Sequence, residues 1–284
     1  MHSDHYFGIS ILLAFFLPLQ ESAANGPAFF PEAAEWRHSG GTAASEIMCP
    51  YELLDTGMEI REDTGRIAEV RFYESFREKC FPDSHFAGNL ANRYLEASEA
   101  LKNSDSRRER RWSSEWLHIA HDLALHATQE DDYNSFAFEM RAAIFAAMAD
   151  RAPLYRMAAL GDSVWAYAHK ALERNEYNYE ALYILGRWHY EVAGLPWIAS
   201  SLRNLLTTGT QASNEKAVWY LERSVETKRQ PDYVYWLGMA YKKLGRLDEA
   251  RQCMQEVADA DADSAWDPSL IENAARFLRD GLLH

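Results

Sequence analysis

Three neighbouring side chains in the stretch WLHIAHDLALH, within about one helical turn, are of the types that bind metal ions. His118 and Asp122 are four residues apart and would share one face of a helix, with His121 beside them. No HExxH motif accompanies them, so we expect structural or exposed histidines rather than a metal site. The sequence also has no glycine-rich phosphate loop and no GxSxG motif. We therefore predict no metal, no cofactor and no catalytic residue, and rank a metal-dependent enzyme using His118 and His121 lowest.

A cluster of arginines in RRERRW is the strongest basic patch of the chain. Arg107, Arg108, Arg110 and Arg111 precede an expected helix. Such a cluster can bind an acidic partner or phospholipid headgroups. More often it forms a solvated loop whose charge is offset by acidic neighbours, here Asp105, Glu109 and Glu115.

Two of the three cysteines lie in the N-terminal part. Cys49 and Cys80 each stand just before a turn-forming proline, and an exported chain would meet oxidising conditions. A Cys49–Cys80 disulfide is one interpretation and two unpaired buried thiols the other, because spacing alone does not bring the Cα atoms together. Cys253 lies in a helical pattern and is expected in the core.

Composition and charge indicate the class of protein whose elements must position these residues. The chain has 284 residues, of which 48% are hydrophobic, with only 14 glycines and 9 prolines, and this favours an all-α protein with a large core. Its formal net charge is −14, from 29 basic and 43 acidic side chains. Nucleic acid is therefore excluded as a partner for the chain as a whole, because phosphates need a basic footprint.

The first 24 residues have the pattern of a secretory signal peptide. An apolar run from Phe7 to Leu19 is followed by Ser22-Ala23-Ala24, a small-residue cleavage pattern. The preceding residues contain no lysine or arginine, and a short membrane anchor through residues 7–19 is the rival interpretation. We expect an exported protein, periplasmic or secreted; the alternatives are a membrane-anchored or a cytoplasmic chain.

The remaining residues divide into a leader, an N-terminal helical region and a repeat domain. Residues 25–46 are rich in Gly, Ala, Ser and Pro, and this composition predicts a flexible leader. We predict an N-terminal helical region over residues 47–129 and the repeat domain over residues 130–284. Helical periodicity predicts helices over 84–102, 113–128, 133–149, 160–174, 178–193, 213–227, 231–244, 247–259 and 268–280. Their pairing through short connections is typical of helical hairpins.

The stretch YWLGMAYKKLGRLDEARQCMQEV fits a tetratricopeptide repeat. Leu237, Gly238, Tyr241, Ala250 and Met254 stand at the places that the repeat requires. Gly238 allows two helices to cross closely, and Ala250 is expected opposite it. The preceding unit has the same Leu-Gly pair at 185–186, but its second-helix alanine, Ala217, comes 31 residues after the glycine instead of 12. An insertion is therefore expected between the two helices of one repeat.

The insertion has the pattern of a short amphipathic helix. Gly194 can end the preceding helix and Pro196 can begin a new one. An apolar face at helical spacing follows, formed by Trp197, Ile198, Leu202, Leu205 and Leu206. This helix either covers the apolar edge of its neighbours or closes a groove to make a pocket.

The concave groove of a repeat array is lined mainly by the first helix of each hairpin. Side chains one helical turn apart on two such helices are Glu180, Tyr183, Arg187 and Tyr190, and Asp232, Tyr235, Met239 and Lys242. These residue types suit an adaptable peptide or ligand surface. Alternatively, several of them pack against the insertion or the C-terminal helix.

The repeat region resembles the regulator of microtubule dynamics protein family. The resemblance covers about residues 130–282, and the insertion is its most diagnostic feature. It is carried by AVWYLERSVE, by LIENAARFLRD and by Gly186, Arg187, Trp188, Tyr190, Trp197, Ile198, Tyr241, Gly245, Ala250, Arg251 and Met254. It implies a non-enzymatic helical repeat scaffold; eukaryotic members are associated with microtubules, and one membrane-anchored member with lipid binding.

Two binding functions follow from the residues and the resemblance. The first is a tetratricopeptide-like solenoid that binds a protein or peptide partner in its groove, with microtubules as a partner only for a cytoplasmic eukaryotic chain. The alternative is a carrier of lipid or small apolar ligands with residues 196–208 as a lid.

Overall fold

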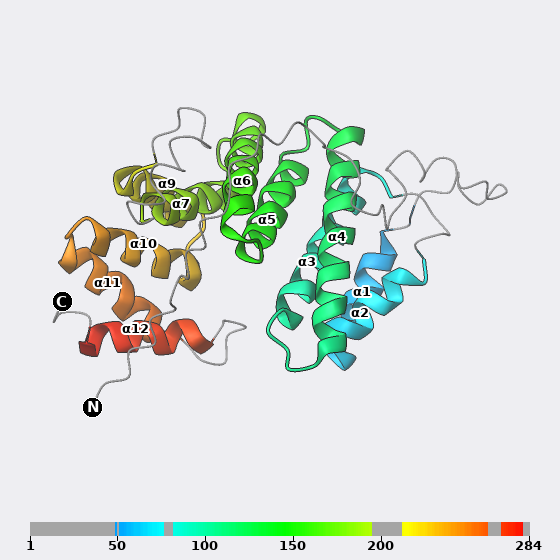
Figure 1. The fold of residues 1–284 in the computed structure, drawn as a ribbon, viewed down its shortest axis with the longest axis horizontal. Coiled ribbons are helices and arrows are strands. Elements are labelled where there is room, and N and C mark those ends of the chain that lie inside the picture. Colours follow the sequence, from blue (N-terminus) through cyan, green and yellow to red (C-terminus); the bar gives the residue numbers. More distant parts are fainter. Residues whose placement is uncertain (1–48, 50, 77–81, 195–211, 261–267, 281–284) are drawn as a thin grey trace, which may run out of the picture. The chain divides into compact units, whose positions relative to one another are not determined.

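The computed structural model describes residues 49, 51–76, 82–194, 212–260 and 268–280. Every regular element in these ranges is an α-helix. None of these helices is both long enough and apolar enough to cross a membrane. The all-α prediction is therefore confirmed for this part of the chain (Figure 1).

Nine of the described helices, α3 to α7 and α9 to α12, correspond to the nine predicted ones, while α1 and α2 lie in the N-terminal region, where no helix bounds were predicted. In chain order they are α1 (Glu52–Thr64), α2 (Arg66–Glu74), α3 (Ser84–Leu101), α4 (Arg107–Glu130), α5 (Ser135–Asp150), α6 (Leu154–Arg174), α7 (Tyr179–Ala193), α9 (Asn214–Thr227), α10 (Pro231–Lys243), α11 (Leu247–Ala258) and α12 (Pro268–Asp280).

Two helices begin about six residues earlier than periodicity predicted. For α4 the reason is local: Ser106 is its N-cap and its hydroxyl accepts a hydrogen bond from the Glu109 amide. The arginines of RRERRW are therefore in the first turns of a helix and not in a loop before it. α6 begins directly after Pro153, whose fixed φ suits the entry to a helix.

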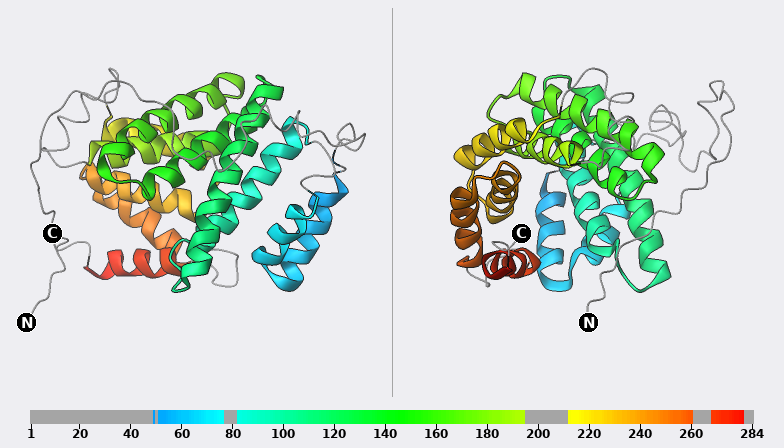
Figure 2. Two further views of the ribbon diagram at one scale, coloured as in Figure 1. Left: turned by 45° about the vertical axis from the view of Figure 1, so that its right-hand side comes forward. Right: turned by 60° about the vertical axis from the view of Figure 1, so that its left-hand side comes forward.

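Consecutive helices form antiparallel hairpins. α3 packs on α4, α5 on α6, α7 on α9 and α10 on α11, and each hairpin contacts the next through both its first and its second helix. α12 packs on α11 and, less extensively, on α10. Figures 1 and 2 show these neighbouring pairs in sequence colours. The α3–α4 pair follows the same packing scheme, so hairpin repetition begins before residue 130.

Two glycines permit the closest helix crossings. A Cβ atom on Gly238 of α10 would lie 2.9 Å from Cys253 Cβ and 3.4 Å from the Ala250 carbonyl oxygen on α11. The expectation that Gly238 lets α10 and α11 approach closely, with Ala250 opposite, is confirmed. Gly186 plays the same part between α7 and α9, where Ala217 is fully buried. The two helices of this repeat thus pack together although 20 residues separate Ala193 from Asn214.

Asparagine N-caps link the α5–α6 and α7–α9 hairpins each to the hairpin before it. Asn134 caps α5 and donates from Nδ2 to Ser84 Oγ, 2.8 Å away at the start of α3. Asn178 caps α7 and donates in the same way to Ser135 Oγ, 2.9 Å away at the start of α5. Each serine hydroxyl in turn donates to a carbonyl near the end of its own hairpin's second helix. We call this periodic arrangement the polar relay.

Candidate functional site on helices α7 and α10

The first helices of two successive hairpins, α7 and α10, carry the eight predicted groove residues. Helix α7 begins at Tyr179 because Asn178 caps it, and α10 begins with Pro231, a residue suited to the first helical position. The two helices contact each other directly. The periodicity of 3.6 residues then places the four side chains of each helix along one side.

Aromatic side chains from both helices form two groups joined by Arg187, and we call the rings of both groups together the aromatic band. The ring centroids of Tyr183 and Tyr233 are 4.5 Å apart, and those of Tyr190 and Trp236 are 5.6 Å apart in an edge-to-face arrangement. Tyr235 also meets Trp236 edge to face. Of these five side chains only Tyr233 is fully buried; the others are partly exposed. Rings held in this way offer a partner large contact areas at a small entropic cost.

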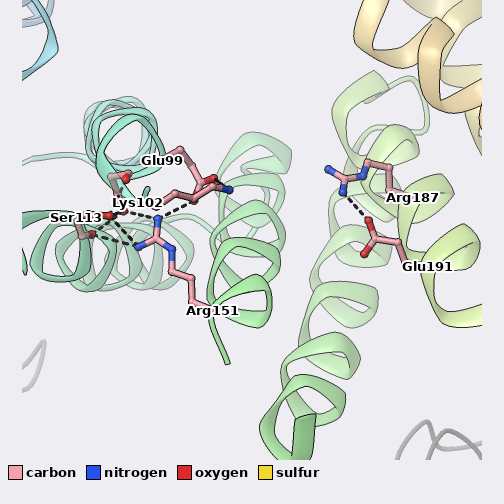
Figure 3. Close-up of polar contacts among 7 residues, drawn as sticks. Glu99, Lys102, Ser113, Arg151, Arg187 and Glu191 are labelled. Atoms are coloured by element: carbon pink, nitrogen blue, oxygen red, sulfur yellow. Dashed lines mark hydrogen bonds and ion pairs between the residues drawn. The ribbon is translucent and has the colours of Figure 1, made fainter. Parts of the chain in front are cut away.

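Arg187 lies within the aromatic band. Its guanidinium carbon is 4.3 Å from the centroid of the Trp236 ring, and its Nη2 donates to Glu191 at 2.5 Å (Figure 3). Burial by itself would lower the pKa of this guanidinium, but Tyr183 and Glu191 raise it, so the Arg187 side chain stays protonated and positively charged. One third of the side chain stays exposed, and its Nε has no hydrogen-bond partner among the described residues.

Carboxyl groups with raised pKa values lie at the N-terminal ends of these helices. Burial raises the pKa of Asp232 to about 6, and the nearby Glu180 contributes to the shift. Burial likewise raises the pKa of Glu180, which accepts a hydrogen bond from the Tyr233 hydroxyl. Burial raises the pKa of Glu139 on α5 to about 8, with a further contribution from Glu180. Glu180 is thus electrostatically coupled to both Asp232 and Glu139, and the pKa of each of the three carboxyl groups lies above its ordinary value.

The C-terminal helix α12 approaches the other end of this surface. Lys242 Nζ lies 5.0 Å from the centroid of the Phe277 ring of α12. Burial raises the pKa of Tyr235, while Arg276 of the same helix lowers it. Met239 packs against the hydrophobic core of the last hairpins. Part of the predicted groove therefore serves packing, as the alternative interpretation expected, while Arg187, Tyr183 and Tyr190 remain partly accessible.

Three residues of this surface were missed from the sequence. Tyr233 stands next to Asp232 in the chain and therefore falls outside the register chosen. Trp236 is four residues after Asp232 and three before Met239, so the same one-turn spacing could have selected it in place of Tyr235. Glu139 belongs to the preceding hairpin and reaches the site by accepting a hydrogen bond from Asn178 Nδ2 at 2.9 Å. A repeat alignment that includes α5 places Glu139 in the same register as Tyr183 and Tyr235, and this signal could have found it.

Some predicted residues lie outside the described part of the chain. These are Cys80, the signal peptide, the leader of residues 25–46 and the five apolar residues of the insertion, Trp197, Ile198, Leu202, Leu205 and Leu206. The Cys49–Cys80 disulfide and the lid therefore stay predictions. Cys253 is a buried free thiol, as expected of a core position.

The histidines considered as metal ligands have other neighbours. His121 Nδ1 lies 3.2 Å from Asp122 Oδ1, and the His121 ring meets Phe145 edge to face at 5.4 Å. His118 is exposed. Within the described ranges, no three His, Cys, Asp or Glu side chains are grouped closely enough to hold a metal ion.

The stacked hairpins, the close glycine crossings and the surface on their first helices define a tetratricopeptide-like helical solenoid. The crystal structure of a thermophilic TPR protein from Thermus thermophilus is similar, with a TM-score of 0.55 and 14% sequence identity over 80% of this chain and 98% of that one. At this identity the similarity concerns the fold alone.

The family described as Regulator of microtubule dynamics protein 1-3 matches residues 57–281, and the chain belongs to this family. The match begins well before residue 130, where the resemblance from the sequence was expected to start, and so includes helices α2 to α4. No curated protein matches the chain.

Proposed function

We propose that the chain is a non-enzymatic interaction scaffold that binds a protein or peptide segment along the aromatic band of α7 and α10. The observation that carries this proposal is the arrangement of Tyr183, Tyr190, Trp236 and Arg187, which are partly exposed and held in place by one another. Tyrosine, tryptophan and arginine are the residue types that most often dominate binding energy at protein interfaces.

The fold supports the same proposal. A solenoid places equivalent faces of successive first helices side by side, and an extended segment can contact several of them at once. The ring faces would supply apolar contact, and Arg187 would supply an ionic contact for a carboxylate of the partner. We further propose that this binding takes place outside the cytoplasm, as the apolar segment of residues 7–19 suggests.

Site-specific photo-crosslinking in the native cell tests the proposal. Benzoylphenylalanine replaces Tyr235 in the aromatic band, and in a matched control it replaces Trp219, which is exposed on α9. We expect a defined crosslinked partner from position 235 only, and we expect Arg187→Ala to weaken that crosslink several-fold because it removes the stacked guanidinium. The same products from both positions, or none from 235, would contradict the proposal.

A further inference from the structure

A second surface, remote in sequence from the aromatic band, lies at the start of α4. Arg107, Arg108, Arg110 and Arg111 are all exposed there, and we call these four side chains the arginine patch. Arg111 pairs with Glu115, at 2.8 Å between Nε and Oε1. None of the other three forms an ion pair with a carboxylate among the described residues. The patch therefore keeps three guanidinium groups without a direct ion pair, beside Asp105 and Glu109, on a chain of net charge −14.

Two of the three unpaired arginines, Arg108 and Arg110, have contacts that leave their charge available. The Arg108 guanidinium carbon lies 4.6 Å from the centroid of the Trp112 ring. Arg110 Nη1 donates to the main-chain carbonyls of Ser104 and Asp105, at 2.6 Å and 3.0 Å. Carbonyl oxygens orient a guanidinium without neutralising it.

A second guanidinium group, from another helix, also lies over the Trp112 ring. Arg71 of α2 lies 4.7 Å from the centroid of the same ring. Its Nη1 pairs with Glu74 at 2.6 Å, and Glu74 also accepts a hydrogen bond from Trp116 Nε1. Stacking on an aromatic ring holds a guanidinium in a plane while its N–H edge stays free for a carboxylate or a phosphate.

The arginine patch lies in the first turns of α4, where a helix favours acidic rather than basic side chains. The N-terminus of an α-helix carries a partial positive charge and favours acidic side chains in its first turn. In α4 only Glu109 satisfies this preference, and its carboxylate is engaged by the Ser104 hydroxyl. The arginines thus add to the positive potential at a place where they do not help the helix to form.

From these contacts we propose that the arginine patch binds a short acidic segment of a partner protein. An acidic segment can place its carboxylates against the free guanidinium edges and remain within the local positive field, because charges are screened beyond about 8 Å at physiological ionic strength. An anionic membrane is a wider partner and would bring its charge close to the acidic remainder of the chain, so the observations favour a peptide.

Fluorescence anisotropy with the full chain and a labelled hexaglutamate peptide tests the proposal, with a hexaglutamine peptide as the neutral probe. The test variant combines Arg107→Gln, Arg108→Gln and Arg110→Gln. The matched control combines Arg156→Gln, Arg229→Gln and Arg251→Gln, which remove the same formal charge from exposed positions elsewhere. We expect the test variant to bind hexaglutamate about tenfold more weakly and the control to lose less than about twofold.

Folding and membrane binding are measured on the same samples. Thermal unfolding of the test variant should occur at the same temperature as in the wild type or slightly above it, because unfavourable charges leave the helix N-terminus. Equal losses in both triple variants would overturn the proposal, since they would reflect net charge only. So would a wild-type chain that binds phosphatidylserine vesicles in an Arg107-dependent way but does not bind hexaglutamate.

Discussion

Gly186 of α7 lies directly against Leu221 of α9: a Cβ atom on the glycine would stand 2.5 Å from Leu221 Cγ and 3.2 Å from the Leu221 main-chain nitrogen. Two helices whose sequences are separated by the insertion are thus in contact at the point where no side chain can fit between them. Leu221 is itself fully buried, so it cannot move aside into solvent.

We therefore expect Gly186→Ala to destabilise the protein by about 1–3 kcal/mol, since the new methyl group must push α7 and α9 apart. Chemical denaturation measures this loss. Gly161→Ala in α6 is the matched control, because there the nearest side-chain atom would be 3.5 Å from the new Cβ and alanine favours the helix. Equal stability of the two variants would show that the crossing is not tightly packed.

Ionisation of Glu139 should lower the folding stability of the protein as the pH rises. The folded pKa of Glu139 is about 8, above the ordinary value of 4.5, so the folded state holds a proton that the unfolded state releases. Its contribution to stability is therefore complete below about pH 4.5 and is lost as the pH rises towards 8.

Glu139→Gln keeps a hydrogen-bond acceptor for Asn178 and cannot ionise. We expect it to raise the free energy of unfolding by on the order of 1–2 kcal/mol at pH 8 and to make little difference at pH 4.5. Denaturation of both proteins at the two pH values measures the difference. A variant with the same advantage at both values would rule out titration of Glu139 as the cause.

Protonation of His189 should lower the folding stability of the protein as the pH falls, which is the opposite of the dependence expected for Glu139. Burial lowers its pKa from 6.5 to about 4, with Lys216 and His169 contributing, and its ring stacks on Tyr220 at 5.4 Å. Its contribution to stability is therefore complete above pH 6.5 and is lost as the pH falls towards 4.

We expect His189→Phe to reduce the loss of stability between pH 6.5 and pH 4, because phenylalanine fills a similar volume and cannot be protonated. It also removes Nδ1, a buried nitrogen with no hydrogen-bond partner in the described part of the chain. The exposed His118→Gln is the control and should leave the pH profile unchanged. Parallel profiles for His189→Phe and the wild type would contradict this prediction.

Arg151 joins three helices near the end of α5. Its Nη2 donates to Ser98 Oγ and Glu99 Oε1 on α3, at 2.9 Å and 2.8 Å, and its Nη1 donates to Ser113 Oγ on α4 (Figure 3). Ser98 and Ser113 are buried and also bond to each other's carbonyls.

We expect Arg151→Ala to cost about 2–3 kcal/mol of folding stability, because it leaves buried hydroxyl groups with fewer partners. Arg151→Lys should recover only part of this, since one ammonium group cannot reach both helices in the same fork geometry. Lys102→Ala removes another partner of Glu99, one that lies directly after the same helix as its C-cap, and should cost less than about 1 kcal/mol. A loss in Lys102→Ala as large as in Arg151→Ala would contradict the role given to Arg151.

The sequence predicted most of the fold because the repeat imposes strict local rules. The spacing from Gly238 to Ala250 identified one hairpin, and the excess spacing from Gly186 to Ala217 located the insertion within another. The start of α4 was misplaced because charged residues before Trp112 hide the apolar periodicity of its first turns. Ser106 and Pro153 are the residues that determine where α4 and α6 begin.

The surface on α7 and α10 was predicted less completely. A single helical register finds residues one turn apart and therefore selected Tyr183, Arg187 and Tyr190. It omitted Trp236, which faces Arg187 from the neighbouring helix, because contacts between helices depend on how they cross and not on spacing along one chain. The raised pKa of Glu139 depends on burial and on Glu180, and neither is visible in a sequence.

The polar relay has a consequence for cooperativity. The Nδ2 groups of Asn134 and Asn178 donate hydrogen bonds to serines of the preceding hairpin. These two hydrogen bonds therefore form only when the preceding hairpin is folded as well. Nearest-neighbour coupling of this kind makes a row of repeats unfold as a block rather than one unit at a time. The smallest stable fragment of this chain should therefore comprise several hairpins, with the exposed cap of its first hairpin as the weakest point.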